Sequence, residues 1–557
     1  MISVDAGRNA ARVVACVTAL TCAAPAQSGP LLKDTLSALG QNPSLRIEGE
    51  ALAAVPLLTE VYARHDYRLL WRDRDRVDEL LLLIRGMHGE GLDPGDYHLD
   101  ALARLLRTPL AKARDPARIA FDLLASDALV RLGVHLRFGK VDAKRLYPRW
   151  NFGDDTDAID AVQLFEAALA SESLHALIRE RLPRQAFYER LKAALSRYRR
   201  ILESGGWPEI PAGPSLEVGM EDLRVPILRA RLVAEGDLPE SEHGAGARFD
   251  PALEAAVKRF QRRHLLEADG VVGPKTRAAM NVPVEARVDQ IRANLERSRW
   301  VFGDLTGDYL VVNIAGFRLF LVRDGAVVFR TEVAVGRPYR KTPVFKAEMT
   351  HLVFNPAWTI PPTILREDVL PKLREDRYYL RKQGWELLDR AGNRIDQDVL
   401  DLSRIPAEDF RYVVRQPPGP NNALGQVKFV FPNPYIVYMH DTNHPELFRF
   451  DRRAFSSGCI RVQRPLELAR LVLNEPERWS AGAIRDAVDG GATQRVSLAE
   501  PLPVLVLYWT VSVPEDGTVR FLPDIYLRDP PIIEGLGAPF RTVSAARELI
   551  LEVDKGD

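Results

Sequence analysis

Hydrophobic residues recur at helical spacing over the first part of this 557-residue chain, from about residue 45 to residue 202. The segments Val77–Ile84 and Ile119–Leu132 show this spacing most clearly. Between them, the residues Gly91-Leu92-Asp93-Pro94 end one helix and begin the next. The pattern predicts a helical domain over residues 27–215.

A stretch rich in Gly and Pro, residues 205–214, predicts a linker after these helices. The unit that follows, residues 221–284, is short, and Asp250 is a suitable N-cap for one of its helices. Apolar side chains then fall on one face of that helix: Leu253, Val257 and Phe260. We expect a small helical domain here, followed by a linker helix over residues 285–304.

From Tyr309 onward the hydrophobic period changes to two, which is typical of strands with one buried face. Turns at Ala315-Gly316 and Asp324-Gly325 separate the first strands and predict a β-meander. The longer strands predicted in this region are Tyr309–Ile314, Val327–Val335, Met349–Phe354, Val427–Phe431, Tyr435–Met439, Val504–Val513 and Val519–Tyr526. Residues 364–412 are charged and less regular, which indicates an insertion or lid.

Together these segments predict a multidomain α+β protein. A helical domain and a small helical domain precede a mostly-β domain over residues 305–530, which contains the insertion. We expect residues 531–557 to form a C-terminal tail. At roughly 150 residues per domain, the length of the chain also favours three or four domains.

The first residues have the pattern of an export signal rather than of a folded helix. Two arginines precede an apolar run of 12 residues, Val13–Ala24, and the small residues Ala24 and Ala26 suit cleavage. This pattern predicts a secretory signal peptide over residues 1–26. A lipoprotein anchor on Cys22 is the less favoured alternative, because the residue before it fits the small-residue rule poorly.

The composition excludes two classes of protein. Lys+Arg and Asp+Glu each number 76, so the net charge is zero, whereas a nucleic-acid binder usually carries a basic excess. The longest apolar stretches have about a dozen residues, whereas a membrane-spanning helix needs roughly 20. We therefore expect no nucleic-acid partner and no integral membrane protein.

Cysteine usage narrows the chemistry. Cys16 and Cys22 lie in the predicted signal peptide, so the mature chain keeps only Cys459. A single thiol in an exported protein forms no internal disulfide. It is either a small buried hydrophobe or a reactive nucleophile, and the residues around it must decide between these.

The segment around Cys459 supplies the groups that a cysteine nucleophile needs. His440 ends a predicted strand 19 residues earlier and is the candidate base for the thiol proton. Gly458 lets the backbone approach a substrate closely, and the amides from Ser457 to Cys459 are candidate donors to a developing oxyanion. Arg461 offers a fork of donors for a carboxylate or a carbonyl.

The residues that flank this pair resemble the active site of the L,D-transpeptidases of the YkuD type. The resemblance is carried by Met439–Thr442, Leu447-Phe448 and Arg453–Val462. Further landmarks are Gly336, Arg340, Thr342-Pro343, Asn355–Trp358, Gly419–Gly425 and Lys428-Phe429. One departure is Ser457, at a position where many members of the family have His.

Two other segments resemble domains that accompany such enzymes. Residues 249–281, with their Phe-Gln, Asp-Gly and Gly-Pro-x-Thr landmarks, resemble a small three-helix peptidoglycan-binding domain. Tyr62–Leu99 resembles the helical scaffold domain of the large periplasmic subgroup. The resemblance spans most of the mature chain and implies a periplasmic location.

The resemblance implies a murein L,D-transpeptidase that forms 3→3 cross-links in cell-wall biogenesis. Cys459 would attack the carbonyl of the third residue of a tetrapeptide stem and release D-alanine, and an amine of a neighbouring stem would resolve the thioester. His440 would act as general base and acid, oriented by the carbonyl of Asp441. The residues implied in oxyanion or substrate binding are Ser457, Gly458, Arg461, Asp441, Asn421 and Trp358.

The implied partners are peptidoglycan stem peptides and glycan, and other wall-synthesis enzymes are compatible with the resemblance. No cofactor or metal is implied, and no H-E-x-x-H or C-x-x-C pattern occurs. An L,D-carboxypeptidase, in which water replaces the amine, stays open, as does a non-catalytic peptidoglycan-binding protein. We expect the insertion over residues 364–412 to cap the active site, since a covered thioester favours an amine acceptor over water.

Overall fold

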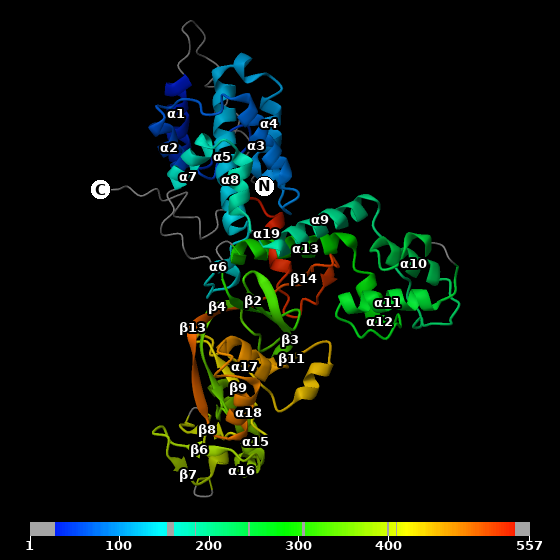
Figure 1. Ribbon diagram of the computed structural model, residues 1–557. Helices are drawn as coiled ribbons and strands as arrows, with labels where there is room; N and C mark the ends of the chain where they lie inside the picture. Colours follow the sequence, from blue (N-terminus) through cyan, green and yellow to red (C-terminus); the bar gives the residue numbers. More distant parts are fainter. Residues whose placement is uncertain are drawn as a thin grey trace, which may run out of the picture.

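The computed structural model shows a helical part, a small helical unit at its side and a β-rich part that ends in a separate lobe (Figure 1). It describes residues 28–152, 161–183, 185–242, 246–302, 307–397, 400–407 and 409–540. The predicted signal peptide lies outside these residues. Among the helices described, none is both long and apolar enough to cross a membrane.

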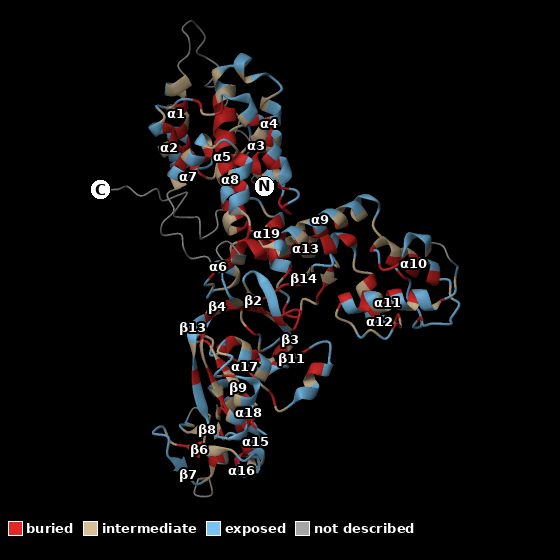
Figure 2. Cartoon of the chain, viewed as in Figure 1, coloured by how far each residue is buried: buried red, intermediate tan, exposed pale blue. Residues whose placement is uncertain are grey.

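The helical part is built around one long helix, α5 (Asp115–Phe138), which is buried along most of its length (Figure 2). The carboxylate of Asp122 accepts hydrogen bonds from the Tyr62 hydroxyl at 2.6 Å and from the Trp71 amide at 2.9 Å. Polar groups buried in α5 thereby fix the chain segments that surround it. Those segments contain α1 (Ser28–Gln41), α2 (Val55–Arg64), α3 (Arg74–Gly86), η2 (Pro94–Tyr97), α4 (Leu99–Leu105), η3 (Leu110–Lys112), α6 (Ala143–Leu146), α7 (Ala161–Ala170) and α8 (Leu174–Arg181).

Two helices, α9 (Ala186–Glu203) and α13 (Val284–Phe302), pack against each other between the three parts of the molecule (Figure 1). The small unit between them contains α10 (Val225–Ala234), η4 (Glu240–Glu242), α11 (Pro251–Arg263) and α12 (Pro274–Met280). Its three α-helices enclose their own apolar core. The helix predicted over residues 285–304 corresponds to α13.

Buried charges attach this small unit to α9. Glu235, at the end of α10, accepts hydrogen bonds from Arg231 at 2.6 Å and from the Tyr198 hydroxyl of α9 at 2.7 Å. Arg263 of α11 approaches the same carboxylate to 2.5 Å. Because unpaired charges are costly to bury, these contacts hold the unit in one orientation.

The β-rich part contains a nine-stranded sheet in the order β11-β3-β12-β10-β9-β4-β13-β1-β2. Because β2 also pairs with β3, the strands from β3 to β2 close into a ring. The strands are β1 (Tyr309–Asn313), β2 (Arg318–Arg323), β3 (Ala326–Gly336), β4 (Phe345–Phe354), β9 (Val427–Val430), β10 (Met439–His440), β11 (Ala454–Ser456), β12 (Ile460–Val462) and β13 (Gln494–Leu507). Three helices complete this part: η7 (Pro445–Arg449), α17 (Pro465–Leu473) and α18 (Ala481–Asp489).

Three predicted strands differ from the structure. The strand predicted over Tyr435–Met439 is confined to β10, because Ile436 has a φ of 57° and the Asn433 side chain accepts from the Tyr435 and Val437 amides at 3.1 Å in a turn. The strand predicted from Val504 begins at residue 494. Its polar first half also pairs with β4, and the register shifts between Ser497 and Leu502. Within the predicted strands Val504–Val513 and Val519–Tyr526, the residues after Leu507 form only the short antiparallel pair of β14 (Val511–Ser512) and β15 (Arg520–Phe521).

The insertion forms a lobe with its own small core, at the end of the β-rich part farthest from the helices (Figure 1). A four-stranded sheet in the order β5-β8-β6-β7 carries it. Its elements are β5 (Trp358–Thr359), α14 (Pro362–Ile364), η5 (Leu365–Val369), α15 (Leu370–Glu375), α16 (Tyr379–Lys382), β6 (Glu386–Leu388), β7 (Arg394–Ile395), η6 (Leu402–Arg404) and β8 (Val413–Gln416). The insertion is therefore a folded subdomain rather than an irregular loop.

The segment expected as a tail from residue 531 also differs from that expectation. Residues Pro530–Gly537 form α19, whose side chains Ile532 and Leu536 are buried in the core of the helical part. Lys140 donates to the Leu536 carbonyl at 2.9 Å. The chain thus returns from the β-rich part and connects it to the helices. The sequence did not predict this return, because two apolar side chains in a short segment do not indicate a helix buried in another domain.

Candidate active site

The pairing of β10 with β12 determines where His440 and Cys459 lie. The two strands are parallel, with His440 opposite Arg461, and the Ile460 amide donates to the Tyr438 carbonyl at 3.1 Å. Side chains alternate along a strand, so Tyr438 and His440 share one face of the sheet with Cys459 and Arg461. Residues far apart in the sequence thereby meet on one surface.

The loop that carries Cys459 is fixed by hydrogen bonds inside it. The Ser456 hydroxyl donates to the Cys459 carbonyl at 2.5 Å and accepts from the Gly458 amide at 3.1 Å. Gly458 has a φ of 121°, a conformation that side chains rarely adopt. The Gly458 amide is thus engaged within the loop, and Ser456 positions the loop although the sequence had given it no role.

A second set of hydrogen bonds holds this loop against the end of β3. The Thr342 hydroxyl donates to the Gly458 carbonyl at 2.8 Å and accepts from the Gly336 amide at 2.9 Å. The Tyr526 hydroxyl donates to the Gly336 carbonyl at 2.5 Å. A Cβ on Gly336 would lie 2.2 Å from the Arg340 carbonyl oxygen, so only glycine fits there. Tyr526 carried no sequence signal, because it comes from a distant C-terminal segment.

The imidazole of His440 is buried and held in one tautomer. Its Nδ1 donates to the Asp441 carbonyl at 2.5 Å, which leaves Nε2 as the atom able to accept a proton. Burial lowers the pKa of His440 to about 3, and the positive charges of Arg461 and Lys428 act in the same direction. The imidazole is therefore neutral at physiological pH.

The thiol of Cys459 is neutral as well. Burial raises the pKa of Cys459, although hydrogen bonding by Tyr438 and the charges of Lys428 and Arg461 oppose this shift. The Lys428 ammonium lies 3.8 Å from the centre of the Tyr438 ring. Tyr438 and Lys428 are thus neighbours of the thiol that sequence reasoning missed, although Lys428 belongs to a family landmark. Both the thiol and the imidazole are therefore neutral at rest.

Asp441 and Asn421 belong to the segments next to His440, and their polar groups bond to neighbouring loop residues. The Asp441 carboxylate accepts from the Gln426 amide at 2.9 Å, and a Cβ on Gly425 would lie 2.4 Å from that side chain. The carbonyl of Asn421, an exposed residue, accepts from the Gln416 side chain at 2.8 Å. Both residues therefore shape the wall next to His440 through the Gly419–Gly425 segment.

Trp358 connects the site to the insertion. It lies on β5, packs against Trp385 with ring centroids 6.0 Å apart, and its side chain approaches Tyr438 beside the thiol. Trp385 and Tyr379 pack on the core of the insertion, whereas Tyr378 is 46% exposed. Tyr378 is thus the exposed ring of the three, with the Arg377 guanidinium 5.2 Å from its centre, and the other two serve packing.

Ser457 is exposed and contacts the insertion through Arg340. The Arg340 guanidinium donates to the Ser457 hydroxyl at 2.9 Å, and it also pairs with Glu367 at 2.8 Å and with Asp368 at 2.5 Å. Glu367 and Asp368 lie on η5 of the insertion. Arg340 therefore joins the cysteine loop to the insertion.

Beside the thiol, Arg461 has capacity to bind a ligand. It is partly exposed, and its Nε is buried without a hydrogen-bond partner among the described residues. A guanidinium with unused N–H groups can donate hydrogen bonds to a carboxylate or a carbonyl oxygen of a ligand. Over the same described ranges, no three His, Cys, Asp or Glu side chains are grouped to hold a metal ion.

Three family models match the chain, and their matches follow the parts of the fold. Residues 56–195 match a "Scaffold domain" and residues 222–280 a "Putative peptidoglycan binding domain". Residues 307–495 match the YkuD model, an "L,D-transpeptidase catalytic domain". These residues define the β-rich part as a catalytic domain of that class.

A "Putative L,D-transpeptidase" of Haemophilus influenzae is 35% identical over 217 residues, which are 39% of this chain and 44% of that relative. The match thus spans less than half the length of that curated relative. A crystal structure of an L,D-transpeptidase from Xylanimonas cellulosilytica matches at 15% identity and a TM-score of 0.16, over 53% of this chain and 99% of that one. No conclusion about the fold follows at that TM-score.

Along the chain, a scaffold domain, a peptidoglycan-binding domain and an L,D-transpeptidase catalytic domain of the YkuD type thus follow one another. The chain has the multidomain α+β architecture expected from the sequence. The residues that carry the chemistry are a separate question, which their geometry addresses.

The low pKa of His440 predicts how its protonation affects stability. Since the folded pKa of about 3 lies below the ordinary value near 6.5, only the unfolded chain takes up this proton as the pH falls through that window. The stability that His440 contributes is complete above pH 6.5 and is lost towards pH 3. We expect the difference in unfolding free energy between parent and His440→Gln to shrink over this range in urea titrations.

The imidazole can also be observed directly. Because burial holds the pKa of His440 near 3, we expect its NMR signals to show no titration midpoint between about pH 5 and pH 8. A midpoint near 6.5 for His440 would contradict the neutral buried pair.

Proposed function

We propose that this protein is a murein L,D-transpeptidase that uses Cys459 as nucleophile and His440 as general base to form 3→3 cross-links in peptidoglycan. The observation that carries the proposal is the tautomer of His440. Its Nδ1 donates to the Asp441 carbonyl, so Nε2 is free to accept a proton on the face of the sheet that carries the thiol. A buried thiol without a base would be inert.

In the first step, the sulfur of Cys459 attacks the carbonyl carbon of the third stem residue while the thiol proton passes to Nε2 of His440. The C–N bond to the terminal D-alanine then breaks, and the proton on His440 passes to the leaving amine. The products are a thioester and free D-alanine. In the second step an amine of another stem loses its proton to His440, attacks the thioester and restores the thiol.

The charges around His440 suit this sequence of events. Burial and the charge of Arg461 disfavour the imidazolium in the empty site. A donor carboxylate bound to Arg461 neutralises that charge, and the oxyanion of the tetrahedral intermediate adds negative charge nearby. The base therefore becomes stronger when donor is bound, which links proton transfer to substrate binding.

The proposal extends to substrate and location. Peptidoglycan stem peptides are the donor and acceptor, and the glycan is the ligand of the peptidoglycan-binding domain, whose family model matches residues 222–280. The predicted signal peptide supports a periplasmic protein. The proposed role is cell-wall biogenesis, without a cofactor.

One experiment separates the proposed activity from its alternatives. Purified protein is incubated with disaccharide-tetrapeptide, and the products are identified by mass spectrometry. Cross-linked dimers with released D-alanine support the transpeptidase, and tripeptide alone would make the protein an L,D-carboxypeptidase. The absence of any product would leave a peptidoglycan-binding protein without this chemistry.

We expect Cys459→Ala to abolish D-alanine release without unfolding the protein. Cys459 is the free cysteine among the described residues, and losing one sulfur should change stability by no more than about 1 kcal/mol. Mass spectrometry of the products and urea unfolding check the two parts. A variant that still forms dimers would exclude the thioester mechanism.

We expect His440→Gln to slow acylation by about 10² or more, the usual effect of losing a general base. The loss should shrink as pH rises, because hydroxide then forms the thiolate without help. The rate of D-alanine release at neutral and alkaline pH measures both effects. His444→Gln is the matched control, since His444 is exposed, and a larger loss in that variant would identify it as the base.

The insertion supports the choice of an amine as acceptor. Arg340 holds η5 of the insertion against the loop of Cys459 through Glu367, Asp368 and Ser457. Trp358 of β5 packs against Trp385 within the same insertion. A thioester covered in this way is less accessible to water, and we propose that the insertion grips the donor stem and protects the intermediate.

We expect Glu367→Gln combined with Asp368→Asn to raise the ratio of tripeptide to cross-linked dimer, because the insertion then loses its ion pairs with Arg340, which bonds to Ser457 of the cysteine loop. Asp376→Asn is the matched control, since Asp376 pairs with Lys382 inside the insertion at 2.7 Å. Product ratios from mass spectrometry decide. A folded double variant with the parent's ratio and donor KM would exclude the protective role.

A further inference from the structure

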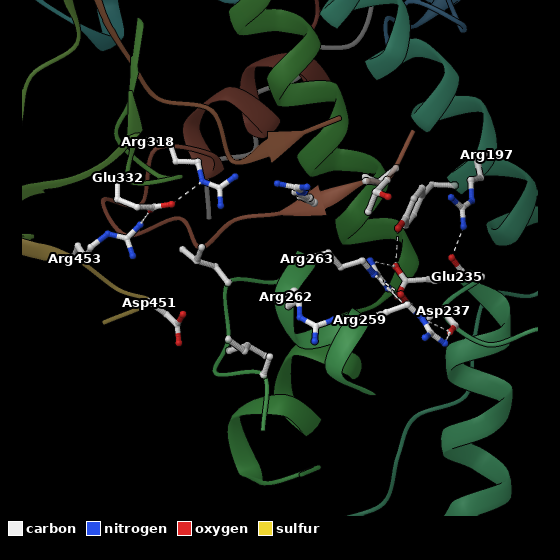
Figure 3. A pocket seen from close by; sticks show the side chains of 18 residues that line it. Arg197, Glu235, Asp237, Arg259, Arg262, Arg263, Arg318, Glu332, Asp451 and Arg453 are labelled. Atoms are coloured by element: carbon white, nitrogen blue, oxygen red, sulfur yellow. Dashed lines mark hydrogen bonds and ion pairs between the residues drawn. The ribbon is translucent and has the colours of Figure 1, made fainter. Parts of the chain in front are cut away.

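A cavity of about 560 Å³ lies where α9, the peptidoglycan-binding unit and the catalytic domain meet, apart from the cysteine loop. Residues of all three parts line it, so it exists only in the assembled molecule. Figure 3 shows Arg262 between a wall that carries Arg318 and Glu332 and a wall that carries Arg197 and Glu235. Its volume suits a small-molecule or peptide ligand.

The lining carries an excess of positive charge. Seven arginines and four carboxylates line the cavity: Arg197, Arg259, Arg262, Arg263, Arg318, Arg453 and Arg520, with Glu235, Asp237, Glu332 and Asp451. Glu235 and Asp237 are bound by Arg263, and Glu332 by Arg318 and Arg453. Asp451 is exposed at the edge. Three of the four carboxylates are therefore already neutralised.

Two of the arginines have capacity for an anion. Arg262 is exposed and Arg520 is half-buried, and neither makes a side-chain hydrogen bond or an ion pair within the described part of the chain. Burial and the neighbouring charge of Arg318 lower the pKa of Arg520, which shows that like charges are held close together there. Such an arrangement is unfavourable when the cavity is empty and becomes favourable when an anion enters.

We infer that this cavity binds the carboxylates of an acidic peptide. The guanidinium forks of Arg262 and Arg520 match carboxylates in geometry and charge. Between the arginines, Leu265, Leu266 and Val519 line the same cavity and offer contacts to aliphatic side chains, which inorganic anions lack. A stem peptide of peptidoglycan combines carboxylates with small aliphatic groups.

The identification of the ligand as a stem peptide rests on the proposed function. The cavity would be a second binding site for stem peptides, in addition to the candidate active site. The cavity is lined by Asp451 and Arg453, which lead directly into β11 and the loop of Cys459. A peptide bound there would hold a second strand of the wall against the catalytic domain while the active site processes the first. The small unit and the catalytic domain would then bind it jointly.

The test uses the full chain with Cys459→Ala, so that no turnover is needed. A fluorescent tripeptide stem ending in meso-diaminopimelate is the probe, and anisotropy gives its Kd. We expect Arg262→Gln combined with Arg520→Gln to weaken binding about tenfold or more, since two charge-assisted contacts are lost. Arg470→Gln, an exposed arginine of α17 outside the cavity, should bind as the parent does.

Further arms separate the sources of binding. Amidation of the peptide carboxyl groups and high salt should both weaken it. If Arg461→Gln removed the binding and the cavity double variant did not, the peptide would bind only at the active site, and the inference would fail. It would also fail if inorganic phosphate bound the cavity as tightly as the peptide does. If the parent protein formed no cross-linked product, the proposed function would be refuted. The binding result for the cavity would be unaffected, because it is measured without turnover.

Discussion

The chemistry of this protein depends on the parallel pairing of two very short strands. β10 has two residues and β12 has three, so their own hydrogen bonds are few. Their register is imposed by β9 and β3, which enclose them within the closed ring of the sheet. A shift of one residue would turn His440 and Cys459 to opposite faces. The ring therefore maintains the geometry that two isolated strands could not.

A network of buried hydrogen bonds fixes the cysteine loop against the sheet. Thr342 links Gly458 to Gly336, and Tyr526 closes the network from the C-terminal segment. The same segment continues into α19, whose Ile532 is buried in the core of the scaffold. The loop of Cys459 and the helical domain are thus connected through one stretch of chain, which gives the scaffold a direct structural relation to the candidate active site.

Positive charge recurs wherever this molecule meets its proposed anionic substrate. Arg461 lies beside the thiol, Arg340 joins the cysteine loop to the insertion, and Arg262 and Arg520 line the cavity at the interdomain contact. The net charge of the chain is nevertheless zero. Cations at these places therefore offer local charge to a proposed acidic ligand, although the chain as a whole carries no net charge.

The sequence by itself determined the order of domains, the change from helical to strand periodicity and the two candidate catalytic residues. These depend on local spacing and on short motifs, which lie within a few residues of each other. Only the tertiary structure decided the tautomer of His440, the neighbours Tyr438 and Lys428, and the fold of the insertion and of α19. Those features arise from contacts between segments far apart in the chain, and no local pattern encodes which distant group fills a given space.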